Sequence, residues 1–194
     1  MVLTWFAGVH GLTTGFANAM FLREGRLPDL SAAAHAAKTG IDVMDFAALV
    51  RAAELSAMLT HVKVTFPLAV AEAMLGGLLV IGSGLAMGGR RGARSLALQV
   101  IAANALLAIA AYLLTRGVRT GWIEVVMGTA SALPEASPQR AAFGEPATLW
   151  WAARIKLIFF DLGPLALGVL ALSSGRTRTF FDAVAHATES AEDP

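Results

Sequence analysis

Long apolar runs constrain this chain more than any other feature of its sequence. The segment PLAVAEAMLGGLLVIGSGLAMGG, residues 67–89, is apolar over more than twenty residues but contains one carboxylate, Glu72. A helix that crosses a bilayer needs about 20 mostly apolar residues, and inside lipid a helix satisfies its own backbone polar groups. We therefore predict an all-α integral membrane protein with four transmembrane helices in one bundle plus outer amphipathic helices. The predicted spans are residues 1–22, 67–89, 95–115 and 155–174.

Composition agrees with a membrane location and excludes several classes of function. Apolar residues make up 56% of the 194 residues and charged residues 15%, whereas soluble domains have about 45–50% and about 25%. The net charge of +1 provides no basic field for nucleic acid. The absence of cysteine excludes disulfides, thiolate chemistry and cysteine-based metal sites. We expect no metal and no cofactor.

The first apolar segment has the properties of a retained helix. It lacks both the basic start and the small-residue cleavage site of a signal peptide. Gly11, Gly15 and Ala19 recur at a spacing of four, which lets another helix approach closely. Gly76 and Gly84 are the corresponding packing candidates in the second span.

The arginines predict the orientation of the chain in the membrane. Arg90, Arg91 and Arg94 lie in the short connection between the second and third spans, and short basic loops stay cytoplasmic. Two more arginines follow the fourth span, in the tail of residues 175–194. Four crossings in a single domain of residues 1–174 then place both termini in the cytoplasm of a bacterial-type inner membrane.

The segments outside the spans are predicted to be partly helical. Ser31 and Gly40 have the residue types that begin and end a helix, and residues 41–64 continue with helical periodicity, with a possible bend at Pro67. Residues 121–133 suit a short interfacial helix. Residues 134–146 contain three prolines and are predicted to form a loop, after which Trp150 and other aromatic residues lead into the fourth span.

Two carboxylates within the spans are the principal candidate site. Glu72 lies about 7–8 Å inside the second span and Asp161 about 9 Å inside the fourth, at 1.5 Å per residue. Charges at such positions are costly and must face protein or water, so they are functional candidates. Because these two spans cross in the same direction in a four-span topology, we expect the carboxylates at similar depth. Two polar residues nearer the middle of the bilayer, Asn104 and His10, complete the candidate set.

Helical spacing predicts which residues share a side with the candidates and face the interior of the bundle. The predicted stripes are Glu72, Gly76, Leu79 and Ser83 on the second span, Asp161, Leu165 and Gly168 on the fourth, and His10, Thr14 and Ala17 on the first. Pro164, next to the stripe of Asp161, leaves the carbonyl of Phe160 without its helical partner.

A purely structural role is the favoured interpretation for each of these residues, and a functional role is the alternative. Asn104 and His10 have the properties of interhelical hydrogen-bonding residues, and the carboxylates can be protonated or paired with groups at the mouth of the bundle. The mouth candidates are Arg51, His61, Lys63, Arg154 and Lys156.

Three functions from different classes remain open. The favoured interpretation is an accessory, assembly or scaffolding subunit of a membrane complex, whose partners are the lipid bilayer and other membrane subunits or copies of itself. The second is a small oligomeric proton- or cation-coupled transporter or channel that uses Glu72 and Asp161. The third is a membrane enzyme acting on a lipid or small apolar substrate, although the sequence contains none of the hydrolase, metalloprotease or nucleotide-binding motifs.

Overall fold

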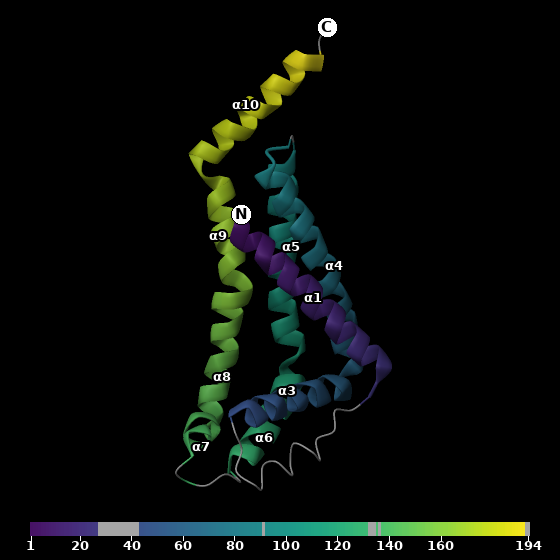
Figure 1. Ribbon diagram of the computed structural model, residues 1–194, viewed down its shortest axis with the longest axis vertical. Helices are drawn as coiled ribbons and strands as arrows, with labels where there is room; N and C mark the ends of the chain where they lie inside the picture. The colour runs from purple at the N-terminus through teal and green to yellow at the C-terminus, as the bar shows by residue number, and fades with distance from the viewer. Residues whose placement is uncertain (27–42, 91, 132–134, 136, 193–194) are drawn as a thin grey trace. The chain divides into compact units, whose positions relative to one another are not determined.

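The computed structural model describes residues 1–26, 43–90, 92–131, 135 and 137–192, and all regular structure in these ranges is helical. Figure 1 shows the helices in chain order. The helices are α1 (Val2–Glu24), α3 (Val43–Thr60), α4 (Val62–Met87), α5 (Ala93–Leu114), α6 (Arg116–Ser131), α7 (Pro138–Phe143), α8 (Pro146–Ile155), the π-helical segment η1 (Lys156–Leu162), α9 (Gly163–Ser173) and α10 (Gly175–Glu192). The all-α prediction is confirmed for these residues. The helix predicted between Ser31 and Gly40 lies outside them.

Three helical segments are long and apolar enough to span a membrane: Val62–Met87, Ala93–Leu114 and Pro146–Ser173. The first two agree with the predicted second and third spans. The third begins nine residues before the predicted residue 155, because α8, η1 and α9 follow one another without a break. Helix α1 is long enough but is not among the three, since its apolar residues are interrupted by polar ones such as His10 and Asn18.

The π-helical segment within the last candidate span has a local cause. Pro164 has no backbone N–H to donate to the carbonyl of Phe160, and its ring would clash with that carbonyl in a regular α-helix. A widened turn over Lys156–Leu162 directly before the proline avoids this clash. The sequence predicted a freed carbonyl at this point but not a change of helix type.

Two details of the outer segments differ from the prediction. The helix before the second span ends at Thr60 and restarts at Val62, so the interruption lies at His61 and not at Pro67, which is inside α4. At the interruption, the Thr65 hydroxyl donates to the carbonyl of Met58 at 2.8 Å. This bond across seven residues holds the two helix ends together.

The predicted proline-rich loop was also partly wrong, because helix α7 forms within it. Ser137 caps this helix by accepting a hydrogen bond from the backbone N–H of Arg140 at 3.2 Å, and Pro138 occupies the first turn. A proline costs nothing there, because the N–H it lacks has no partner within the helix. Proline spacing alone does not separate a loop from a capped helix.

Contacts divide the chain into two compact units. Unit 1 comprises Met1–Asn18, Leu68–Ala110 and Leu157–Pro194, and unit 2 comprises Ala19–Pro67 and Ala111–Lys156. The core of unit 1 joins α4, α5 and α9. Its buried residues are Leu79, Ala86, Ala93, Ala97, Val100, Ile101, Leu165 and Leu172. A Cβ at Gly89, just after α4, would lie 2.8 Å from the ring of Phe180 in α10, so the end of α4 packs against α10.

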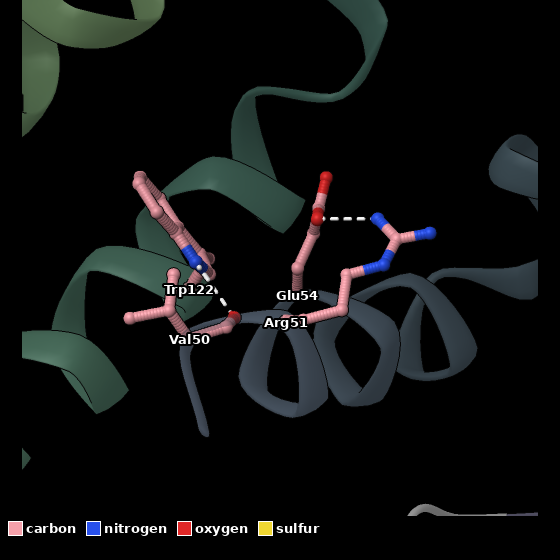
Figure 2. A network of polar contacts seen from close by, with 4 residues as sticks. All are labelled: Val50, Arg51, Glu54 and Trp122. Carbon is pink, nitrogen blue, oxygen red and sulfur yellow. Dashed lines mark hydrogen bonds and ion pairs between the residues drawn. The ribbon is translucent and has the colours of Figure 1, made fainter. Parts of the chain in front are cut away.

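The core of unit 2 joins α3, α6 and α8. Its buried residues are Ala53, Ile123, Val126 and Leu149, with aromatic residues around them. Figure 2 shows the contact between α3 and α6, in which the indole Nε1 of Trp122 donates to the carbonyl of Val50 at 3.2 Å. The predicted interfacial helix is α6, which begins five residues earlier than expected, at Arg116.

Candidate functional site

Glu72 lies on the side of α4 that faces α1. Its Cγ atom is 4.0 Å from the position that a Cβ would take at Gly11. The side chain is half-buried and engages another group of the protein. Gly76, Leu79 and Ser83 continue the same stripe along α4, and all three are buried. The inward direction predicted for this stripe is therefore confirmed.

The contact between α1 and α4 depends on glycines at which the two backbones nearly touch. A Cβ at Gly15 would lie 2.8 Å from the carbonyl oxygen of Ala69, and a Cβ at Gly76 would lie 2.9 Å from that of Gly8. Gly8 belongs to the same set and was not among the predicted packing residues. Gly11 is looser, since its nearest neighbour is 3.6 Å away.

Gly84 corrects the prediction for the second span. It is exposed, and no heavy atom lies within 4 Å of the Cβ position outside its own helix. It is two turns after Gly76, whereas the close contacts of α4 with α1 include Gly76 and Ala73. Spacing alone identified a small residue but not the point at which the helices cross.

Asp161 lies within the π-helical segment, three residues before Pro164. The side chain is half-buried and, like Glu72, engages another group of the protein. Leu165 and Gly168, on the predicted common side, are buried. A Cβ at Gly168 would lie 2.8 Å from the Thr4 side chain, so α1 also packs against α9. Both carboxylates belong to unit 1; their equal depth stays a prediction.

Two polar side chains of α5 bind backbone carbonyls of neighbouring helices. The Asn104 amide nitrogen donates to Leu75 of α4 at 3.1 Å and to Val100 of its own helix at 2.9 Å. The Arg94 Nε donates to Leu172 of α9 at 2.9 Å. Asn104 thus takes the interhelical role that the sequence favoured over a functional one.

His10 does not follow the predicted inward stripe of α1. It is exposed, as is Ala17 of the same predicted stripe. The buried side of α1 instead carries Thr4, Gly8 and Asn18. The glycines determine which side of α1 packs inward, because only there do the backbones approach closely, and His10 falls on another side.

The predicted mouth residues all belong to unit 2, where each has its own surroundings. Arg51 pairs with Glu54 at 2.6 Å on the exposed surface of α3 (Figure 2). The His61 ring lies 3.0 Å from the Cβ position of Gly117. Lys63 and Arg23 line a cavity of about 340 Å³ with Leu22, Val62, Phe66 and Pro67. Lys156 begins the π-helical segment and engages another group.

A second cavity in unit 2, of about 510 Å³, was not foreseen. We call it the arginine pocket. It is lined by Tyr112, Leu113, Arg116, Arg119, Ala147, Trp150, Trp151 and Arg154. Only Arg154 and the tryptophans had been singled out from the sequence. The sequence signal that was available is a set of arginines and aromatic residues near the ends of two predicted spans. These residues come from two separate segments, 112–119 and 147–154, and only folding brings them together.

Aromatic rings and a hydroxyl hold the Arg119 guanidinium in this pocket. Its central carbon lies 3.9 Å from the centre of the Tyr112 ring and 5.9 Å from that of Trp150. One terminal nitrogen donates to the Thr115 hydroxyl at 3.0 Å. Burial lowers the pKa of Arg119, an effect that Tyr112 opposes and Arg116 reinforces. An arginine nevertheless remains protonated at physiological pH, so the pocket carries a fixed positive charge.

Comparisons with protein-family models, curated proteins and solved structures found no match for this chain. Within the described residues, His, Asp and Glu form no group of three or more that would hold a metal ion.

Proposed function

We propose that this chain is a multi-pass accessory, assembly or scaffolding subunit of a membrane complex. The observation that supports this proposal most directly is the use of polar side chains in unit 1 as links between helices. Asn104 joins α5 to α4, Arg94 joins α5 to α9, and Glu72 faces the contact between α4 and α1. Neither of the two cavities described above is lined by Glu72 or Asp161.

The proposal includes α1 as a fourth spanning helix. Its glycines pack against the apolar helix α4, and Thr4 is fully buried against α9. A helix packed in this way against two candidate spans has its polar residues covered by protein, which offsets its lower hydropathy. Four crossings would place both termini on the cytoplasmic side of a bacterial-type inner membrane, with the basic connection that contains Arg90.

Cysteine labelling tests this topology cleanly because the chain has no cysteine of its own. With an impermeant thiol reagent on intact cells, we expect Gly25→Cys to be labelled and Val2→Cys to be protected. Thr120→Cys and Gly88→Cys serve as the outer and cytoplasmic references. Labelling of both Val2→Cys and Gly25→Cys would mean that α1 does not cross.

Purification from native membranes tests the scaffolding function. We expect the tagged full chain, extracted in mild detergent, to elute with other membrane subunits at a fixed stoichiometry measured by native mass spectrometry. Glu72→Gln should preserve this assembly and its activity, because the amide keeps the size and hydrogen bonding of the carboxyl. Glu54→Gln, on the exposed surface of α3, is the matched control. A chain that elutes alone or only with its own copies would contradict the proposal.

A second candidate function is cation or proton transfer by a homo-oligomer. It is favoured by the position of Asp161 in a π-helical segment, because π-bulges occur frequently at functional sites. Chain reconstituted in liposomes would then conduct protons or cations, and Glu72→Gln and Asp161→Asn would each abolish the flux without unfolding the protein. The absence of flux from wild-type chain would exclude this candidate.

A further inference from the structure

The arginine pocket contains three positively charged side chains and lies at the ends of two candidate spans. Arg116, Arg119 and Arg154 line it, and no carboxylate pairs with any of the three in the part of the chain that the structure describes. The Nε atom of Arg119 is buried and makes no hydrogen bond there either. Buried polar atoms in native proteins nearly always have a partner. These groups therefore favour an anionic ligand.

The surroundings of the pocket distinguish a lipid from a free anion. Tyr112 and Leu113 belong to the last turn of the candidate span α5, while Trp150, Trp151 and Arg154 lie in the first turns of the candidate span Pro146–Ser173. Tyrosine and tryptophan at span ends mark the headgroup level of a bilayer. Leu113 and Trp151 are also largely exposed, so apolar surface lies beside the charged groups. A ligand with a phosphate and acyl chains matches both features.

The aromatic rings further restrict the headgroup. Such rings can bind the quaternary ammonium of choline through their faces, but here arginines already occupy them. Arg119 lies over Tyr112 and Arg154 lies 5.1 Å from the centre of Trp151. The arginines would repel the positive charge of a headgroup such as choline. A headgroup with net negative charge would not.

We propose that the arginine pocket binds the phosphate headgroup of an anionic phospholipid. The three guanidinium groups hold the phosphate oxygens through charge-assisted hydrogen bonds, which are often bidentate. The acyl chains lie along the exposed apolar side chains at the ends of the two spans. This site is independent of any partner subunit, so its failure would leave the scaffolding proposal intact.

The test is lipid binding by the full chain in detergent micelles, measured by native mass spectrometry with phosphatidylglycerol and phosphatidylcholine as probes. We expect phosphatidylglycerol to be retained over phosphatidylcholine. The double variant Arg116→Gln/Arg154→Gln should weaken phosphatidylglycerol binding about tenfold or more, because it removes two of the three guanidinium groups that make charge-assisted hydrogen bonds to the phosphate. Arg51→Gln, which removes one positive charge outside the pocket, from an arginine already paired with Glu54, should bind as the wild type does.

Further measurements identify the ligand and control for misfolding of the variants. The double variant spares Arg119, whose contacts with Tyr112 stabilise the fold, and its circular dichroism spectrum must match the wild type. Arg119→Lys keeps the charge but loses the planar fork, so it should weaken phosphatidylglycerol binding while preserving the preference over phosphatidylcholine. Equal retention of both lipids, or undiminished binding by the double variant, would overturn the proposal. Displacement of the lipid by equimolar inorganic phosphate would show a free-anion site instead.

Discussion

The helices of unit 1 and those of unit 2 pack by different means. In unit 1, α1 and α4 approach until their backbones nearly touch, and only glycine fits at Gly15 and Gly76. In unit 2, α3, α6 and α8 bury Leu149, Ile123 and Val126 beneath a rim of aromatic rings. Lipid tails are as apolar as leucine, so membrane helices gain little from hydrophobic burial and depend on close packing and hydrogen bonds. Amphipathic helices near water gain from burial itself.

The largest expected effect tests burial in unit 2. Leu149 is 1% exposed within the cluster that joins α3, α6 and α8. Leu149→Ala should destabilise the protein by about 2–5 kcal/mol, because the change removes buried methyl groups and leaves a cavity. Thermal unfolding in detergent, followed by circular dichroism, measures the effect. Leu113→Ala at an exposed position is the control, and an equal loss from both variants would contradict the assigned core.

Close packing in unit 1 should give the next largest effect. Gly76→Ala forces a methyl group against the backbone of α1, and we expect a loss of about 1–3 kcal/mol from overpacking. Gly84→Ala adds the same methyl group at an open position of the same helix. Since alanine is the better helix former by about 0.8–1.0 kcal/mol, Gly84→Ala should be neutral or stabilising. If the two variants unfold at the same temperature, α1 does not pack where the structure places it.

A third prediction compares the stability contributed by one interhelical hydrogen bond in unit 1 with that contributed by one in unit 2. Asn104→Ala removes the bond to Leu75, and transmembrane bonds of this kind average about 0.6 kcal/mol. Trp122→Phe removes the bond to Val50 and leaves the carbonyl to be satisfied by water, with an expected cost of about 0.5–1.5 kcal/mol. Chemical denaturation of both variants checks the order. A loss of several kcal/mol for Asn104→Ala would show that polar links, and not glycine contacts, dominate unit 1.

The smallest effect should come from the surface of α3. Arg51 and Glu54 are each about half exposed, and exposed pairs contribute roughly 0.2–1 kcal/mol. Arg51→Gln should therefore shift the unfolding midpoint very little, and the shift should vanish in high salt. A large, salt-independent loss would indicate that Arg51 has a buried structural role.

Much of the helical organisation was predictable because it depends on short-range patterns. Apolar runs predicted α4, α5 and the span that contains α9, and the stripe from Glu72 to Ser83 correctly predicted the inward side of α4. The start of α8 at Pro146 and the capped helix α7 were missed. Those boundaries depend on single capping residues such as Ser137. One capping residue is a weaker sequence signal than three prolines, which predict a loop.

The candidate site was only partly accessible from the sequence. Glu72 and Asp161 stood out because a carboxylate in an apolar run is costly anywhere in the fold. His10 was misplaced because helical periodicity alone does not say which of several small-residue stripes packs inward. The arginine pocket was missed because Arg116 and Arg154 are 38 positions apart in the sequence, and no local pattern links them.

By itself, the amino-acid sequence determined that the chain is helical and suited to a membrane, and it identified which polar residues would need protein around them. Backbone hydrogen bonding in lipid and the length of apolar runs are local properties, so they need no knowledge of the fold. The tertiary structure alone decided which glycines meet a neighbouring backbone, which side of α1 is buried, and that three arginines share one cavity. Such contacts join residues far apart in the chain, and only the packing of complete helices brings them within reach.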